Sequence, residues 1–170
     1  WTLPANVAIS LHPDFVYEAF EHGDETLIFA KELKEAFEKE TGLTLESTGQ
    51  TWKGSELEGY KTQHPFLARE SVVILGEHVT LDAGTGAVHT APGHGQEDYI
   101  VGLRYNLPIL SPVDAKGQFT SDVGVPEWVG LNVFKANPKV IERLREKNVL
   151  LGFKEFEHSY PHCWRSKTPL

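Results

Sequence analysis

The sequence contains no methionine, a single cysteine and no long apolar run. The lone Cys163 excludes an internal disulfide framework and is typical of a reducing compartment such as the cytoplasm. No apolar stretch approaches the roughly 18 residues of a membrane-spanning helix. We also expect no signal peptide. Because the sequence contains no methionine at which translation could start, we expect residues 1–170 to be a single domain excised from a longer protein.

Positive charge is also scarce. The chain has 16 lysines and arginines against 24 aspartates and glutamates, which gives a formal net charge of −8. Affinity for nucleic acid comes mainly from basic side chains that displace the counterions of phosphates. The composition therefore argues against autonomous nucleic-acid binding, and any nucleic acid that reaches this domain is expected to be held elsewhere.

Several catalytic motifs are missing as well. The chain lacks the Gly-x-Ser-x-Gly of a serine nucleophile and the Gly-Lys-Ser/Thr of a phosphate-binding loop. Gly84-x-Gly86 has no third glycine at the spacing of a dinucleotide-binding loop. Cys163 follows His162, but neighbouring side chains of an extended chain point apart, and no other partner is evident. The sequence therefore does not support covalent catalysis.

The apolar pattern predicts a mixed α+β domain rich in strands. Strands are expected at residues 7–11, 15–20, 43–49, 71–76 and 87–90. Residues 109–135 are also expected to be strand-rich, with a hairpin-like turn from Asp114 to Gly117. Because strands outnumber helices and are interspersed with them, we expect a barrel-like β-sheet core with flanking helices.

Two helices are clear from their apolar spacing and end signals. A helix over residues 31–41 is expected to end at Gly42. A second, over residues 138–148, is expected to have Asn137 as its N-cap and Pro138 at its first position. A third helix is expected to begin at Gly95.

Reactive side chains are concentrated in residues 84–99, Gly-Thr-Gly-Ala-Val-His-Thr-Ala-Pro-Gly-His-Gly-Gln-Glu-Asp-Tyr. The first part is typical of a buried strand, which Ala-Pro-Gly at 91–93 would end. Apolar spacing after Gly95 indicates a helix with Asp98 near its first turn. A strand end followed by a tight turn and a helix start leaves backbone N–H groups free, which favours a binding site.

His89, His94 and Asp98 allow three interpretations. They are structural if His89 is a hydrogen-bonded core histidine and Asp98 complements the helix dipole, as in a non-catalytic interaction module. They belong to a metal-dependent hydrolase if they ligate an ion, although His-x4-His-x3-Asp matches no established ligand spacing. In the third interpretation, Asp98 captures a substrate ammonium and His89 forms a rigid wall that excludes larger substrates.

Residues 84–99 resemble the central motif of the editing domain inserted into class I aminoacyl-tRNA synthetases of the isoleucine, valine and leucine group. Trp-Thr-Leu-Pro-Ala-Asn at 1–6 is similar to the end of that domain's threonine-rich signature, and residues 52–60 and 159–165 also match. The resemblance thus covers nearly the whole chain. Within the group, His89 and the turn after it are similar to the isoleucyl members. The threonines that precede the proline of the signature are not in this sequence.

The resemblance implies that the domain proofreads protein synthesis by hydrolysing the ester of mischarged valyl-tRNA(Ile). The implied partners are the 3′ end of tRNA(Ile) carrying valine and the remainder of the synthetase chain. It implies a monomer with no membrane association. It also implies no cofactor and no metal in this domain, whereas the parent synthetase would use ATP and Mg²⁺.

The resemblance also implies site residues, with catalysis assigned to Asp98 and Thr2. Asp98 would bind the α-ammonium of valine, and His89 would crowd the side-chain pocket and refuse isoleucine. Thr2 and Asn6 would lie near the terminal adenosine or the attacking water. Asp98 is not expected to act as a general base, because an ion-paired carboxylate is a poor proton acceptor. The implied substrate-binding residues are Trp1, Thr2, Asn6, Gly86, His89, Gly93, His94 and Asp98.

Overall fold

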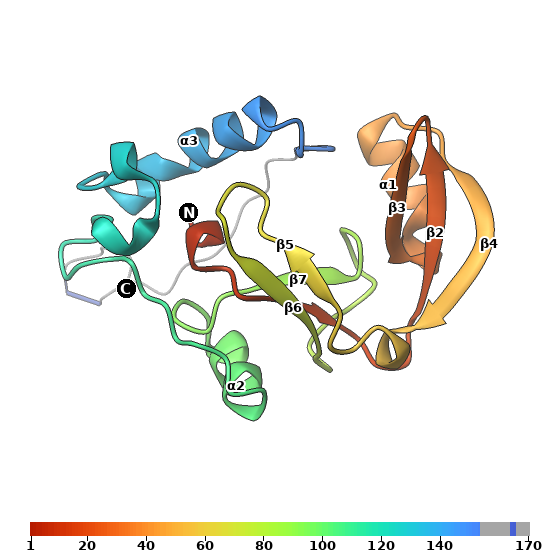
Figure 1. Ribbon diagram of the computed structural model, residues 1–170, viewed down its shortest axis with the longest axis horizontal. Helices are drawn as coiled ribbons and strands as arrows, with labels where there is room; N and C mark the ends of the chain where they lie inside the picture. Colours follow the sequence, from red (N-terminus) through yellow and green to blue (C-terminus); the bar gives the residue numbers. More distant parts are fainter. Residues whose placement is uncertain (154–163, 166–170) are drawn as a thin grey trace.

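The computed structural model describes residues 1–153 and 164–165 (Figure 1). Its strands are β1 (Ala8–Leu11), β2 (Val16–His22), β3 (Glu25–Ala30), β4 (Glu46–Lys53), β5 (Lys61–Gln63), β6 (Glu70–Leu75) and β7 (Ala87–Thr90). Its helices are α1 (Lys34–Thr41), α2 (Gln96–Arg104) and α3 (Val133–Glu146). Short 3-10 turns are η1 (Leu3–Ala5), η2 (Lys31–Leu33), η3 (Gly54–Glu56), η4 (Ser121–Val123) and η5 (Pro126–Trp128). Among the described helices, none combines the length and apolar character needed to cross a membrane.

Two sheets form the framework. In the four-stranded sheet the order is β5-β6-β1-β7, with β1 parallel to β6 and antiparallel to β7. The second sheet is antiparallel, in the order β3-β2-β4. The mixed α+β fold with flanking helices is confirmed. Neither sheet closes into a barrel in the described part of the chain, since each begins and ends on a different edge strand.

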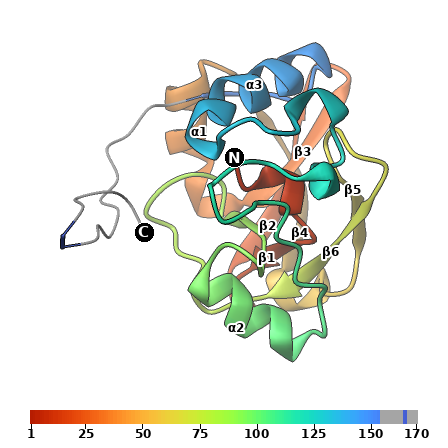
Figure 2. The same ribbon diagram turned by 90° about the vertical axis from the view of Figure 1, so that its left-hand side faces the viewer.

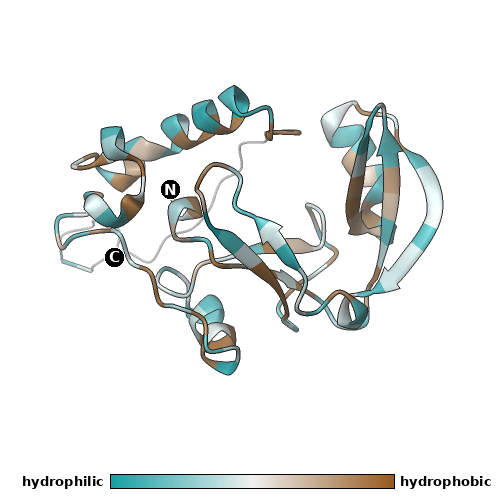
Figure 3. Cartoon of the chain, in the orientation of Figure 1, coloured by the Kyte–Doolittle hydropathy of each residue, from teal (hydrophilic) through white to brown (hydrophobic). Residues whose placement is uncertain are grey.

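Three apolar clusters hold these layers together. The first lies between the two sheets and α1 and includes Tyr17, Phe20 and Phe37. In the second, Val101 of α2 packs with Ile74 on the opposite face of the four-stranded sheet. The third packs α3 against the segment around η4 and η5. Figure 2 shows α2 and α3 at opposite ends of the molecule, and Figure 3 shows the contrast between hydrophobic β3 and the polar edge strand β4.

The end of α1 follows its sequence signals. Gly42 is the C-cap and adopts the left-handed conformation, with φ of 74°. Its N–H donates to the Glu38 carbonyl at 2.8 Å, which satisfies a backbone acceptor in the last turn. The predicted start at residue 31 is a 3-10 turn that leads into the α-helix.

The predicted start of the last helix was wrong. The N-cap of α3 is Asn132, whose side chain accepts a hydrogen bond from the N–H of Phe134 at 3.1 Å. Pro138 therefore lies inside the helix rather than at its first position. Val133 and Ala136 are buried in the third cluster. Their burial stabilises the helical residues that precede Pro138, so the helix begins N-terminal to the proline.

The strand-rich prediction for residues 109–135 was also wrong. This segment contains η4, η5 and two isolated bridges, Val113 with Phe119 and Gln118 with Asn132. Its apolar side chains pack against α3 instead of joining a sheet. The turn at 114–117 is confirmed, because the N–H of Gly117 donates to the Asp114 carbonyl at 3.0 Å.

Strand β3 was not predicted, and the strand expected at 43–49 runs from Glu46 to Lys53. Both pair with β2, which is the central strand of the second sheet. The short strand β5 pairs antiparallel with β6 at one edge of the four-stranded sheet.

Candidate functional site

The turn between β7 and α2 carries the central motif. The N–H of His94 donates to the Ala91 carbonyl at 2.9 Å and closes the turn. A Cβ at Gly93 would lie 2.0 Å from the carbonyl oxygen of Leu110, so only glycine allows this approach of the two backbones. Gly95 is the extended N-cap of α2. The turn is therefore fixed by packing on one side and by a helix start on the other.

Asp98 lies in the first turn of α2, as predicted, and is half-buried. Its Oδ2 accepts a hydrogen bond from the N–H of Ala91 at 2.8 Å, which ties the helix back to the strand end. Among the described residues Asp98 forms no ion pair, with Arg104 or with any other base. Oδ1 also has no hydrogen-bond partner there. One carboxylate oxygen thus anchors the turn, and the negative charge has no cation of the domain beside it.

The imidazole of His89 lies between two residues of the N-terminal segment. Its Nε2 is 3.0 Å from Thr2 Oγ1, and its Nδ1 is 2.8 Å from Asn6 Nδ2. Burial lowers the pKa of His89 to about 4, against the opposing effect of the nearby Asp98 charge. His89 is therefore neutral at physiological pH and is held on both ring nitrogens.

Residues 1–6 fold across the turn. The rings of Trp1 and His94 meet edge to face, with centroids 4.9 Å apart. Burial lowers the pKa of His94 as well. The structure thus brings Trp1, Thr2 and Asn6 to His89 and His94, although more than 80 positions separate the two segments.

Gly86 lies away from this cluster, at the start of β7. Its φ is 67°, and a Cβ there would lie 2.6 Å from the Cβ of Ala30. Its carbonyl accepts a hydrogen bond from the hydroxyl of Tyr17 at 2.6 Å. Gly86 therefore joins β7 to the second sheet and affects the site through the placement of that strand.

A hollow of about 250 Å³ lies on the sheet face that His89 shares with Ile9 and Ala87. Apolar and polar side chains share its walls, which suits a ligand that combines both characters. The lining residues are Leu3, Asn6, Ile9, Thr62, Gln63, Pro65, Ser71, Ala87 and His89.

Sequence reasoning missed Ser71, Thr62 and Gln63 as neighbours of the site. Thr62 pairs with Ser71 between β5 and β6, so the two side chains share a face of the sheet. Ser71 is buried, and its hydroxyl donates to Asn6 Oδ1. The available signal was a small polar residue on the inward face of an otherwise apolar strand, Ser-Val-Val-Ile-Leu at 71–75.

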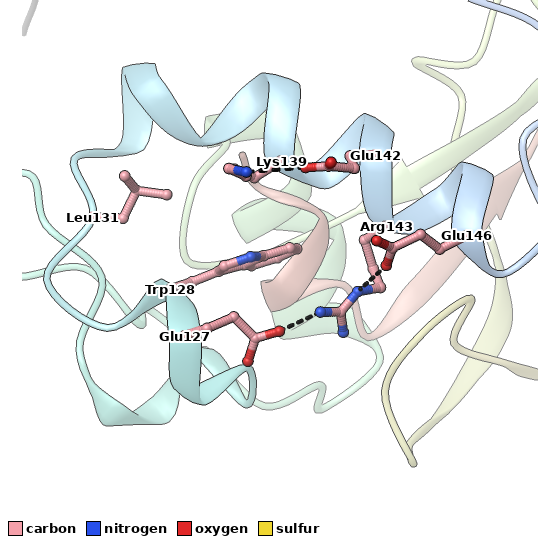
Figure 4. A pocket seen from close by; sticks show the side chains of 7 residues that line it. All are labelled: Glu127, Trp128, Leu131, Lys139, Glu142, Arg143 and Glu146. Carbon is pink, nitrogen blue, oxygen red and sulfur yellow. Dashed lines mark hydrogen bonds and ion pairs between the residues drawn. The ribbon is translucent and has the colours of Figure 1, made fainter.

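A larger hollow, of about 380 Å³, lies between η5 and α3, far from this chemistry in the sequence (Figure 4). Arg143 crosses it, with its guanidinium carbon 5.6 Å from the centre of the Trp128 ring. The same guanidinium pairs with Glu127 and, at 3.2 Å, with Glu146. Because Arg143 is already paired with two carboxylates and packed on Trp128, we assign this hollow a structural role.

No group of three His, Cys, Asp or Glu side chains within residues 1–153 and 164–165 is arranged to hold a metal ion. Both nitrogens of His89 face protein hydrogen-bonding groups, so neither is oriented toward an ion. His162 and Cys163 lie outside the described residues.

Comparison with known proteins gives a consistent result. The sequence profile of the family described as "Leucyl-tRNA synthetase, editing domain" matches residues 5–127. Over its full length the chain is 54% identical to the isoleucine–tRNA ligase of Caldanaerobacter subterraneus subsp. tengcongensis. It is 52% identical to that of Desulforamulus reducens and 51% identical to that of Petrotoga mobilis. The chain spans 18% of the length of each of these relatives.

A solved structure is also similar in fold. The crystal structure of GlLeuRS-CP1 matches 91% of this chain and 80% of its own, with a TM-score of 0.70. The two sequences are 16% identical over this match. The arrangement of two sheets and flanking helices is therefore shared at low sequence identity.

Proposed function

We propose that this chain, which belongs to the leucyl-tRNA synthetase editing-domain family, is the proofreading domain of an isoleucine–tRNA ligase and hydrolyses valyl-tRNA(Ile). The observation that carries the proposal is a carboxylate without a cation, on Asp98, near enough to a neutral, fixed imidazole, on His89, for its charge to act on that imidazole. A charged group and a rigid wall are what a site needs to select a small amino acid attached through its carboxyl group.

Asp98 binds the α-ammonium of the attached valine. Its Oδ2 already accepts a hydrogen bond from Ala91, so the substrate ammonium meets a carboxylate that cannot turn away. The position in the first turn of α2 also favours the charged carboxylate, because the N-terminal end of a helix carries partial positive charge. Binding of the ammonium therefore fixes the position of the ester.

His89 limits the size of the side chain that fits. A site that accepts isoleucine cannot strongly reject valine, which is one methylene smaller. Isoleucyl-tRNA synthetase is the standard example, and it uses a second, hydrolytic site, the second sieve, to remove valine. The second sieve must accept valine and refuse isoleucine. Hydrogen bonds on both ring nitrogens hold His89 in place, so the ring cannot move aside for the extra methylene.

The reaction is hydrolysis of an ester. A water oxygen adds to the ester carbonyl carbon, and the bond from that carbon to the ribose oxygen breaks. The products are valine and a tRNA with its terminal hydroxyl restored. The domain acts by positioning the reactants. Asp98 holds the amine, and the Thr2 hydroxyl orients the attacking water by a hydrogen bond. The hydroxyl of the substrate's own ribose assists, and no side chain becomes acylated.

The remaining assignments follow from this role. With a net charge of −8, the domain relies on the rest of the synthetase to hold the tRNA. Trp1 and His94, whose rings pack edge to face, border the substrate site beside Thr2 and Asn6, and Gly93 maintains the turn. We expect a cytoplasmic, monomeric enzyme whose editing domain uses no cofactor or metal, while the ligase reaction uses ATP and Mg²⁺.

The test replaces Asp98 by asparagine in the complete protein. Asp98→Asn keeps an oxygen to accept from Ala91 but removes the charge, so the turn is preserved. Losing a partly buried charge pair costs about 2 kcal/mol or more, and hydrolysis of valyl-tRNA(Ile) is expected to fall about 30-fold or more. Glu97→Gln, at the exposed neighbouring carboxylate, is the control and should leave the rate unchanged. Equal rates for wild type and Asp98→Asn would reject the proposal in favour of a non-catalytic module.

A further inference from the structure

Ser71 is a buried hydroxyl that the reaction described above does not use. It lies on β6 with 2% of its surface exposed, and it faces the hollow beside His89. Its Oγ donates a hydrogen bond to Asn6 Oδ1. A buried polar side chain on a strand is costly unless its hydrogen bonds are satisfied, so this contact gives Ser71 a defined orientation.

The orientation of the Asn6 amide follows from its neighbours. Asn6 Nδ2 lies 2.9 Å from the carbonyl oxygen of Ala8, and a carbonyl can only accept. The nitrogen must therefore face Ala8 and the oxygen must face Ser71. The carbonyl of Ala8 thus fixes the orientation of the amide, and the Ser71 hydroxyl, which can donate or accept, donates to the oxygen that faces it.

The protonation of His89 follows in turn. The second N–H of Asn6 Nδ2 points to His89 Nδ1 at 2.8 Å, so Nδ1 accepts and carries no proton. A neutral imidazole then has its proton on Nε2, which donates to Thr2 Oγ1 at 3.0 Å. Among the described residues the Thr2 hydroxyl makes no other hydrogen bond. Its own proton is thus left to donate outward.

We propose that Ser71 is a positioning residue of the editing site: through Asn6 it holds His89 as the Nε2–H tautomer and leaves the Thr2 hydroxyl as a donor toward the substrate or the attacking water. The proposal rests on the proposed function, since it assigns a donor for ester hydrolysis. The relay Ser71–Asn6–His89–Thr2 joins β6, the N-terminal segment and β7, which no stretch of sequence brings together.

The tautomer is measured directly by ¹⁵N NMR of the protein labelled at histidine, with the His89 signals assigned by their loss in His89→Gln. We expect an unprotonated Nδ1 and a protonated Nε2 in the wild type at pH 7. Asn6→Asp places an acceptor beside Nδ1, so the proton should move to Nδ1. A wild-type His89 with its proton on Nδ1, or on both nitrogens, would overturn the proposal.

Ser71→Ala tests the contribution of the hydroxyl to catalysis. It leaves Asn6 Oδ1 buried without its donor, and we expect kcat for valyl-tRNA(Ile) hydrolysis to fall about tenfold with little change in KM. Ser71→Thr restores the hydroxyl, and its methyl group has room because position 71 borders the hollow, so activity should return. Ser10→Ala is the matched control. Ser10 is equally buried but donates to or accepts from Thr90 on the other face of the sheet, so kcat should be unaffected.

The outcomes separate the two proposals. If the wild type does not hydrolyse valyl-tRNA(Ile), the proposed function fails, and the NMR measurement still decides the tautomer. If the wild type is active and Ser71→Ala matches it in kcat, the positioning role of Ser71 fails while the editing function stands. A loss in Ser71→Ala that Ser71→Thr does not restore, or that Ser10→Ala reproduces, would assign Ser71 to the core alone.

Discussion

Lowering the pH is expected to destabilise the domain through His89. Because burial lowers the pKa of His89 from 6.5 to about 4, the unfolded chain takes up a proton at this position before the folded one does. The stabilisation is therefore complete above pH 6.5 and is lost as the pH falls toward 4. Between pH 7 and pH 5 this amounts to about 2 kcal/mol, or a fall of about 4–8 °C in Tm.

The assay is the unfolding temperature of the wild type and of His89→Gln at both pH values, by calorimetry. The variant should be less stable at pH 7 but should lose about 2 kcal/mol less than the wild type on going to pH 5. Ile74→Val is the control. Ile74 is fully buried in the same sheet and does not titrate, so its cost should be the same at both pH values. Parallel pH dependence in the wild type and His89→Gln would refute the assignment of a buried, neutral His89.

Three further predictions concern the site and its turn. His89→Ala should allow hydrolysis of isoleucyl-tRNA(Ile), which we expect the wild type not to hydrolyse, and an unchanged preference in a deacylation assay would show that His89 does not set the size limit. Gly93→Ala should lower Tm by about 6–12 °C, from about 3 kcal/mol of backbone displacement at Leu110, and a thermal scan within about 1 °C of the wild type would contradict the close approach. Dialysis against a chelator should leave valyl-tRNA(Ile) hydrolysis unchanged, and one zinc per chain by elemental analysis, with lost activity on its removal, would support the metal-dependent alternative.

Local signals in the sequence were sufficient to predict the ends of helices and strands where a few neighbouring residues determine the backbone conformation. Gly42 ends α1, and the Ala-Pro-Gly of 91–93 ends β7, because each depends on backbone conformation that a few neighbouring residues dictate. The grouping of His89 with Asp98 is local for the same reason, since a turn of a few residues separates them.

Features that depend on packing were not predictable in this way. Pro138 is typical of the first position of a helix, which is why the sequence predicts a start there. The helix begins after Asn132 because Val133 and Ala136 are buried in the third cluster. Residues 109–135 carry apolar side chains that suit a strand, but they pack on α3 and find no strand partner.

The same holds for the part of the site that lies outside the central motif. Ser71 reaches Asn6 because β6 runs parallel to β1, and a parallel pairing between strands about 60 residues apart leaves no periodic trace in the sequence. The position of the N-terminal segment against His89 was inferred from resemblance alone, and its hydrogen bonds required the structure.

The most direct test of the central claim asks whether Asp98 recognises the charge on the amine. Single-turnover hydrolysis is measured for valyl-tRNA(Ile) and for N-acetyl-valyl-tRNA(Ile), whose amine is uncharged, with the wild type and with Asp98→Asn in the complete protein. If Asp98 binds the ammonium, acetylation lowers the hydrolysis rate of the wild type by about 30-fold or more and has little further effect on the rate of Asp98→Asn. An equal loss on acetylation in both proteins would contradict the account.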